Sequence, residues 1–413
     1  HDDQLTVQDY VFIMGAQRAA DIGVMNFGDN PTMSGNITAG GEADENGYGN
    51  FAFAVPSGFL APNSANLTAP EFQGIDYFKP VLYTGNGTAI GSGGKAVTGV
   101  GWKPDEVWIK NRDATDDHAL YDIVRGVTKQ LESNTLTAES TEAEGLTTFG
   151  SDGFTIGSLA QVNTNTEDYV SWNWLGSNST ATTSPAGSIA STSTVASAGH
   201  FSVGTYTGQT AAGTVGHGLG GIAEMVIVWD KGFANSIAVY HVGVASDAAT
   251  DYLLLNGIGA AVDDITFWND TTPTASVFSV GTGNNTNGNT RPKSFLAFRS
   301  VPGVCKVGSF VGNANANGPY IDLGFKPAFF MAKSTGVENW IMLDDKRPNY
   351  NPTGGYLFAN LNNAEGGLGG EYVDFLSSGV KIRTTGASVN GSATFIYLAM
   401  ADIGGNGTLP PVY

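Results

Sequence analysis

The sequence predicts an all-β protein in which three antiparallel β-sandwiches of a jelly-roll-like type follow one another. Short runs of Val, Ile, Thr and aromatic residues alternate with Gly, Asn and Asp at a spacing of roughly ten residues, which is typical of sandwich strands and their turns. Glycine is abundant, with 57 in 413 residues, and only 14% of the residues are charged, so strands and turns are favoured over helices. Helical spacing is scarce, and its best example covers residues 114–124.

The third observation is that landmark residues recur at matching spacings along the chain. Glycines end the first apolar run of each unit and asparagines end a later one: Gly85, Gly208, Gly312, Asn134, Asn256 and Asn360. The separations between successive glycines match those between successive asparagines to within one residue, whereas chance matches would drift. We therefore expect three units of one fold.

Each unit is expected to hold the same elements in order. An opening strand ends at the landmark glycine, and a turn then leads to a β-branched run such as residues 106–110. A short apolar strand follows, closed by a polar residue that we interpret as a turn cap: Asp122, His241 or Asp344. A strand that turns on glycine and a final aromatic strand end the unit.

The landmarks divide the chain into six parts. We expect a partial β segment and connector over residues 1–76 and a tail over 403–413. Residues 177–198 are rich in Ser, Thr and Ala, the composition of a linker or of an extended surface strand. The three sandwiches cover residues 77–176, 199–300 and 303–402.

The front of the chain predicts association with other copies. Residues 10–14 and 22–31 look like two strands, which cannot bury a core alone. Their apolar side chains, including Val11, Ile13 and Phe27, would stay uncovered in a monomer. We expect a homo-oligomer, with a trimer as the first choice, and the competing outcome is a front segment that folds back on the first sandwich.

Charge and composition exclude several classes of protein. The net charge of −19 is opposite in sign to the basic surface that binds nucleic acid. The apolar runs fall far short of the about 20 residues needed to cross a bilayer, so no membrane insertion is expected. The single cysteine, Cys305, cannot form an internal disulfide.

Catalytic and cofactor signatures are weak. None of the five histidines lies in a recognisable triad signature; His241 is interpreted as a turn cap and His217 as a loop residue. Adjacent carboxylates, such as Asp344 with Asp345, are interpreted as solvated acidic loops. Residues 44–47 share residue types with calcium loops but lack their ligand pattern, so calcium is possible and no cofactor is predicted. Residues 85–95 are interpreted as a hairpin turn rather than a phosphate loop.

One loop combines an aromatic side chain with polar neighbours, as a sugar-binding platform would. It supplies the only binding residues that we predict, for a glycan or a protein partner: Asn339, Trp340, Asp345, Lys346, Arg347 and Tyr350. Plain core packing of Trp340 is the competing interpretation, and no catalytic residue is predicted.

Residues 24–67, with Asn-Phe-Gly at 26–28 and Pro-Ser-Gly-Phe at 56–59, resemble the closing strands of the SPRY-like domain at the front of many marine tailed-phage proteins. In those proteins repeats follow with a Tyr-Thr-Gly-Asn-Gly opening and a Gly-Phe-Lys-Pro-Asp-like turn, similar to residues 83–87 and 101–105 here. The resemblance spans nearly the whole chain and implies a virion component, described as tail-fibre-like or structural, without defined catalytic residues. Most of the SPRY-like part is absent.

Three functions follow as expectations. The first is a non-enzymatic virion structural protein of a tailed bacteriophage, a tail-fibre or adhesin component on the particle surface that contacts other virion proteins and a host-surface glycan. The second is a capsid-decorating cement or head-fibre protein. The third is an extracellular polysaccharide-active enzyme, which would need two converging carboxylates.

Overall fold

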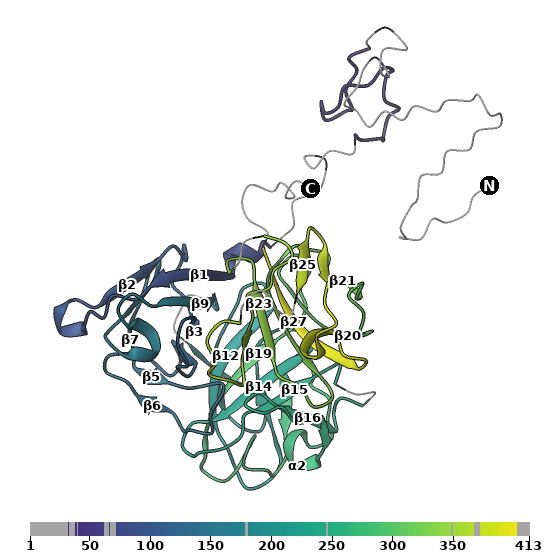
Figure 1. Ribbon diagram of the computed structural model, residues 1–413. Helices are drawn as coiled ribbons and strands as arrows, with labels where there is room; N and C mark the ends of the chain where they lie inside the picture. The colour runs from purple at the N-terminus through teal and green to yellow at the C-terminus, as the bar shows by residue number, and fades with distance from the viewer. Residues whose placement is uncertain are drawn as a thin grey trace. The chain divides into compact units, whose positions relative to one another are not determined.

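A computed structural model gives the fold (Figure 1). It describes residues 32, 38, 40–61, 66, 72–177, 181–244, 247–347, 350–366 and 372–402. The chain forms two compact units, one of residues 1–69 with 405–409 and one of residues 70–404 with 410–413. The expected strands at residues 10–14 and 22–31 lie outside the described residues.

Within the first unit, the described residues 40–61 form a loop closed by a bridge between Glu42 and Phe51. The carboxylate of Asp44 organises this loop. Its Oδ1 accepts from the backbone N–H groups of Asn46 (3.0 Å) and Tyr48 (2.8 Å), and its Oδ2 accepts from that of Ala61 (2.8 Å). Burial raises the pKa of Asp44, but these donors outweigh it and the net shift is downward.

The larger unit is all-β and is built from two-sheet sandwiches. In residues 77–176, hereafter the first segment, one sheet has the order β1-β9-β3-β4 and the other the order β2-β8-β7. The strands are β1 (Phe78–Thr84), β2 (Lys95–Thr98), β3 (Glu106–Asn111), β4 (Ala119–Asp122), β7 (Leu146–Gly150), β8 (Gly153–Ile156) and β9 (Asp168–Trp174), with β5 (Lys129–Gln130) and β6 (Ser140–Thr141) as a separate pair. Short helices are η2 (Gly74–Asp76), η3 (Ile90–Ser92) and α1 (Ala160–Asn163).

The same order recurs in the second segment, residues 199–300. Its main sheet contains β12-β19-β14-β15-β16-β17, and β13 pairs with β18 in the other sheet. The elements are β12 (Phe201–Thr207), β13 (Gly213–Gly216), β14 (Met225–Asp230), β15 (Ala238–His241), β16 (Asp251–Leu254), β17 (Val262–Asp263), α2 (Ile265–Trp268), β18 (Val277–Val280) and β19 (Pro292–Phe298).

The third segment, residues 303–402, has the sheets β20-β27-β22-β23-β24 and β21-β26-β25. Its elements are β20 (Cys305–Val311), β21 (Tyr320–Asp322), β22 (Pro327–Ser334), β23 (Ile341–Asp344), β24 (Leu357–Phe358), β25 (Val373–Leu376), β26 (Gly379–Ile382), α3 (Ala387–Asn390) and β27 (Thr394–Ala401). In all three segments the first strand pairs with the last, which pairs with the third, which pairs with the fourth. The exact domain boundaries stay a prediction.

The predicted equivalence of Asp122, His241 and Asp344 is confirmed by the register. Each lies opposite the first paired residue of the third strand of its segment, respectively Glu106, Met225 and Phe329. Each also caps the turn that follows its strand. Asp122 accepts from the backbone N–H of Arg125 (2.7 Å), Asp344 from that of Arg347 (2.9 Å), and His241 Nδ1 from that of Gly243 (3.0 Å).

Backbone crowding explains the landmark glycines. A Cβ atom would lie 2.0 Å from the Thr164 carbonyl oxygen at Gly85, and 2.1 Å from the Gly391 carbonyl oxygen at Gly312. Since real Cβ contacts are never this short, the first strand can pass the last helical turn of its segment only with glycine at that position.

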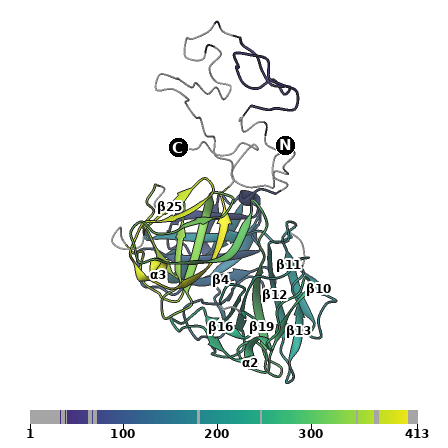
Figure 2. The same ribbon diagram turned by 90° about the vertical axis from the view of Figure 1, so that its right-hand side faces the viewer.

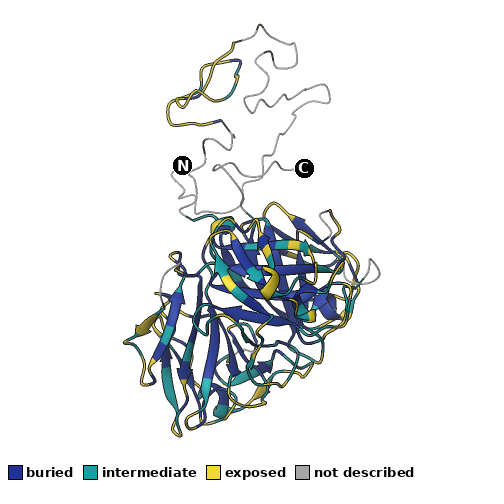
Figure 3. Cartoon of the chain, turned by 90° about the vertical axis from the view of Figure 1, so that its left-hand side faces the viewer, coloured by how far each residue is buried: buried dark blue, intermediate teal, exposed yellow. Residues whose placement is uncertain are grey.

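The central strands of each main sheet, β3, β14 and β22, are buried on both faces, and they are among the dark strands in Figure 3. Alternate residues along a strand face opposite sides. On β3, Val107 and Ile109 pack inside the first sandwich, whereas Trp108 points into a core that the three segments share. The second and third sandwiches have inner cores of their own. The three segments are therefore parts of one packed body and not separate beads on a string.

Three sequence-based interpretations need correction. Within residues 177–198 the linker interpretation gives way to its alternative, an extended strand, because β10 (Thr182–Ser184) and β11 (Ser191–Val195) extend the second main sheet beyond β12 (Figure 2). Residues 85–95 do not make a hairpin turn, since they lead from one sheet of the first sandwich to the other. Within residues 114–124, the best example of helical spacing, residues 119–122 form strand β4.

The first strand of each segment has one residue, five positions before the landmark glycine, whose backbone is blocked from pairing with another molecule. The block differs in each segment. In the first segment this position is Pro80, which has no N–H to offer. In the second, Val203 pairs with Thr194 of β11. In the third, Ser300 Oγ accepts from the N–H of Val307 (3.0 Å) and donates to its carbonyl (3.3 Å).

Candidate functional site

The residues predicted as a binding site do not form one surface. Trp340 is only 1% exposed and belongs to the shared core, so the proposed sugar platform is wrong. Arg347 is also 1% exposed, whereas Tyr350 is 56% exposed. The polar residues that follow Trp340 in sequence belong to the turn after β23, while its own indole ring points inward.

The other predicted residues make local contacts. Asn339 Oδ1 accepts from the side-chain amide of Asn360 at 2.8 Å, and Lys346 Nζ lies 3.0 Å from Asp345 Oδ2. Burial raises the pKa of Asp345 to about 7, and repulsion from Asp402 adds to the shift. Asp344 is fully buried, so the interpretation of Asp344 with Asp345 as a solvated acidic loop is also wrong.

The boundaries between segments, which we call seams, carry buried polar contacts. At each seam a ring nitrogen of one segment meets the backbone carbonyl that lies two residues before the landmark asparagine of another. The pairs are Trp229 Nε1 with Glu132 O (3.0 Å), Trp340 Nε1 with Leu254 O (2.8 Å) and His118 Nε2 with Phe358 O (3.0 Å). The second segment thus contacts the first, the third contacts the second and the first contacts the third, which closes a ring.

Asparagine landmarks support the residues that make these contacts. Asn134, Asn256 and Asn360 each accept, through Oδ1, the backbone N–H of the residue that precedes the fourth strand. The three distances are 3.0, 3.0 and 2.8 Å. For Asn134 and Asn360 the supported residues are His118 and Trp340, so these two landmarks fix the backbone from which a seam contact is made, whereas Asn256 supports Ile237.

A buried ion network lies at the seam between the first and third segments. Arg347 Nε lies 2.6 Å from Asp344 Oδ2, which also accepts from the indole N–H of Trp172 at 3.0 Å. Glu365 extends the network, 3.5 Å from Arg347 Nη1 and 2.6 Å from Arg112 Nε of the first segment. Because each charge has a nearby opposite charge, the network fixes how the two segments meet.

The seam between the first and second segments repeats this network. Arg125 pairs with Asp122 through its Nε and lies 3.4 Å from Glu139 through its Nη1. Glu139 reaches Lys231 of the second segment, 3.8 Å away. Glu106 is buried beside this group. Burial raises its pKa well above the ordinary range, Asp122 adds to the shift and Arg125 opposes it.

Uncharged side chains occupy the corresponding positions at the seam between the second and third segments: His241, Val244, Ala261 and Thr335. The backbone contact is nevertheless retained, since the Ala261 N–H donates to the Thr335 carbonyl at 2.9 Å, as the Glu365 N–H does to the Arg112 carbonyl at 2.8 Å. In place of ion pairs, His241 Nε2 faces the Tyr397 carbonyl at 3.1 Å.

Buried lysines are the residues most similar to nucleophiles. Lys293 pairs with Asp230 at 3.0 Å, whereas Lys110 and Lys333 lie at corresponding places on β3 and β22. Burial lowers the pKa of Lys110 and of Lys333 to about 8 in each case. Lys110 Nζ donates to the Asn111 and Ala114 carbonyls at 2.5 and 3.1 Å. Lys333 Nζ donates likewise to the carbonyls of Ser334 and Gly336. Both side chains therefore hold the loop that follows the third strand.

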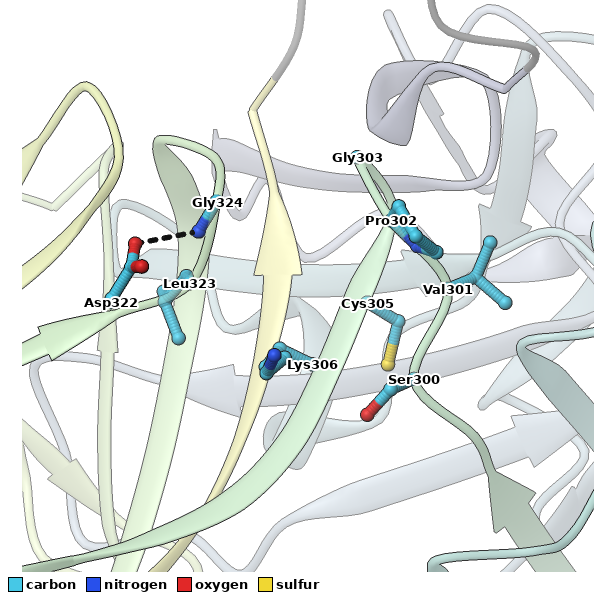
Figure 4. Close-up of a pocket in the computed structure, with 9 residues that line it drawn as sticks. All are labelled: Ser300, Val301, Pro302, Gly303, Cys305, Lys306, Asp322, Leu323 and Gly324. Carbon is cyan, nitrogen blue, oxygen red and sulfur yellow. Dashed lines mark hydrogen bonds between the residues drawn. The ribbon is translucent and has the colours of Figure 1, made fainter. Parts of the chain in front are cut away.

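A pocket of 280 Å³ lies where the second segment passes into the third (Figure 4). Its lining comprises Ser300, Val301, Pro302, Gly303, Cys305, Lys306, Asp322, Leu323 and Gly324. Burial raises the pKa of the Cys305 thiol, which stays protonated and unreactive. Asp322 Oδ1 accepts from the Gly324 N–H at 3.1 Å, and Ser300 is used by Val307, so these polar groups serve the local backbone.

Within the described ranges, no group of three or more His, Cys, Asp and Glu side chains could hold a metal ion. The calcium-like residues 44–47 use the Asp44 carboxylate to accept backbone N–H groups, as described above. The described helices include none with the length and hydropathy required to span a bilayer.

Sequence inspection missed the seams because their acceptors are backbone carbonyls and their donors differ in kind. A signal was nevertheless present: β3, β14 and β22 are continuous apolar runs, and such runs are typical of sheets covered on both faces. A family model described as a domain of unknown function (DUF7483) matches residues 73–403, which includes all three segments. No curated protein matches the chain.

Proposed function

We propose that the ring of three segments is a rigid structural module of a tailed-phage virion. The chain belongs to the DUF7483 family, whose domain includes the entire ring. In this proposal the protein is a non-enzymatic tail-fibre or adhesin component at the particle surface. The resemblance of residues 24–67, 83–87 and 101–105 to virion proteins supports the phage assignment.

The observation that carries the structural role is the closed ring. Three ring-nitrogen contacts to equivalent backbone carbonyls join the segments, and one core continues through all of them. Buried ionisable groups, among them Asp344, Arg347 and Lys110, are held by neighbouring side chains and backbone carbonyls. Such groups serve rigidity, since moving any of them leaves a buried charge unpaired.

Purified particles provide the test. An antibody raised against the whole chain should label tails or fibres in electron micrographs of intact virions. Labelling of the capsid surface would favour the cement or head-fibre alternative instead. If the protein is absent from purified particles by mass spectrometry, the proposal fails.

The enzymatic alternative has its own test. Incubation with host-type polysaccharides is expected to release no reducing ends. Saturable release that is abolished by replacing one buried carboxylate, such as Asp344→Asn, and retained in the exposed variant Tyr350→Ala, would replace the structural proposal by a hydrolase.

Association with further copies is the second part of the proposal. The ring covers its core within one chain, so the case for a homo-oligomer rests on the predicted strands in residues 1–76. We expect a trimer at micromolar concentration in moderate salt, where repulsion from the −19 charge is screened. A single 42.9 kDa species in sedimentation would contradict this part alone.

A further inference from the structure

Two histidines hold the third segment to its neighbours, one at each of its seams. His118 Nδ1 accepts from the Trp108 indole N–H at 2.8 Å, so its proton lies on Nε2, which faces the carbonyls of Phe358 (3.0 Å) and Leu361 (3.2 Å) of the third segment. The tautomer follows from these partners. The ring is fully buried.

His241 has the same arrangement at the other seam. Its Nδ1 accepts from the Gly243 N–H at 3.0 Å, and its Nε2 faces the Tyr397 carbonyl of β27 at 3.1 Å. The ring is 1% exposed. Both histidines are therefore neutral and use both nitrogens.

A second ring proton would break both arrangements. Protonated Nδ1 becomes a donor and would face the N–H of Trp108 or of Gly243, leaving two donors opposed. The charges that act on His118 come from Lys110 on β3 and Arg347 after β23, and both oppose an imidazolium.

The surroundings of the two rings include few carboxylates that could stabilise a positive charge. Asp117 precedes His118 and accepts from the Asn134 amide at 2.6 Å, while Asp344 pairs with Arg347. Next to His241, Glu224 accepts the backbone N–H of Ser300, and the nearby titratable groups Tyr397 and Cys305 are neutral.

We propose that His118 and His241 form an acid-sensitive latch whose protonation releases the third segment from the other two. The seam between the first and second segments is joined instead by Trp229 and by Thr194 of β11, whose hydroxyl donates to Asp105 Oδ1 of the first segment at 3.5 Å. His200 lies against Tyr77 there, with ring centroids 5.1 Å apart, but neither of its ring nitrogens has a hydrogen-bond partner. This inference does not depend on the virion assignment.

Burial supports the direction of the effect. Desolvation, first among the causes, lowers the pKa of His118 to about 3 and that of His241 to about 4. A solvated histidine titrates at about 6.5, so the released state binds protons more readily, and release becomes more favourable as the pH falls below about 6.5.

Cys305 reports release without any substitution. It is the single cysteine, it is 1% exposed, and it lies on β20 in the shared core. Its labelling by 4,4′-dithiodipyridine should be at least about hundredfold faster near pH 4.5 than near pH 7.5, normalised to free cysteine at each pH. Far-UV circular dichroism should show that the strands persist, because release of a segment leaves each sandwich intact.

Variants identify the groups responsible. In the double variant His118→Asn/His241→Asn, an amide oxygen takes the place of Nδ1 at both sites and does not titrate, so the acid acceleration should fall at least about tenfold. The matched control is His217→Asn, because His217 has the same pattern, with Nδ1 accepting from Leu219 and Nε2 facing Thr274, but lies inside the second segment. This control should keep the wild-type acceleration.

Three outcomes would overturn the latch. Acid labelling that coincides with loss of the circular dichroism signal would show global unfolding instead. Equal acceleration in the double variant and the wild type would assign the effect to the carboxylate networks. Loss of acceleration in His200→Phe but not in the double variant would place the sensitive site at the other seam.

Discussion

Trp340 Nε1 donates a 2.8 Å hydrogen bond to the backbone carbonyl of Leu254, across the seam between the third and second segments. One side chain thereby fills the shared core and satisfies a backbone acceptor that belongs to another segment. The contact is equivalent to that of His118 with Phe358, so the ring is held by the same device made from different residues.

Replacing Trp340 should therefore lower the stability of the whole ring. Trp340→Ala removes a fully buried aromatic side chain and leaves the Leu254 acceptor without its donor, for an expected loss of about 3–5 kcal/mol. Urea denaturation followed by circular dichroism measures the change. The control Tyr350→Ala, at a 56% exposed position, should stay within about 0.5 kcal/mol. A larger effect at Tyr350 than at Trp340 would reverse our assignment of the core.

Asp345 gives a pH-dependent prediction with a definite sign. Its pKa is raised to about 7 in the folded protein, so the folded state retains a proton that the unfolded chain releases near its ordinary value of 3.8. The loss of folding stability caused by ionising Asp345 is absent below pH 3.8, grows as the pH rises and is complete above about pH 7. Asp345→Asn should stabilise the protein by on the order of 1 kcal/mol or more at about pH 8 and change little near pH 4.

Unfolding midpoints of Asp345→Asn and the wild type at the two pH values decide this point. The matched control is Asp322→Asn, which changes an exposed carboxylate at the end of β21 in the same segment. An equal shift at both pH values would mean that packing, and not ionisation, is responsible.

The ion network around Asp344 should be more costly to break than the surface pair beside it. Asp344→Ala leaves the fully buried Arg347 guanidinium and the Trp172 indole N–H without their acceptor, so we expect a loss of about 3–5 kcal/mol. Lys346→Ala removes an exposed partner of Asp345 and should cost less than about 1 kcal/mol. Denaturant midpoints compare the two, and similar losses would contradict the network.

The three asparagine landmarks should contribute similarly. Asn134→Ala, Asn256→Ala and Asn360→Ala each leave a backbone N–H without its acceptor, at a cost of about 1–3 kcal/mol. Thermal unfolding of the three single variants gives the comparison. A neutral result at any one of them would show that its hydrogen bond is replaced by water.

Residues that act within one segment could be predicted from the sequence. The turn caps Asp122, His241 and Asp344 recur at fixed spacing, and their hydrogen bonds span two or three residues. The all-β class follows from the same local patterns. Contacts between residues that are close in the sequence can be predicted, because residue type and spacing together specify the turn.

The ring and its seams could not be predicted in this way. Trp340 has polar neighbours in the sequence, and its acceptor, Leu254, is 86 residues away and contributes only a backbone carbonyl. Equivalent positions at the seams carry Arg347 in one segment and Val244 in another. The residue type at each of these positions depends on the groups that the neighbouring segment places opposite it. A single sequence does not show which positions of two segments face each other.

The blocked positions on the first strands affect how copies of this protein can contact one another through their backbones. Pro80 lacks a donor, Val203 is already paired, and the Val307 backbone is taken by a serine hydroxyl. An exposed edge is where sheets of neighbouring molecules would fuse through their main chains. At these three positions the first strands offer no free backbone N–H, so a contact made there between copies depends on side chains, and the outer edge of the second main sheet lies at β10 instead.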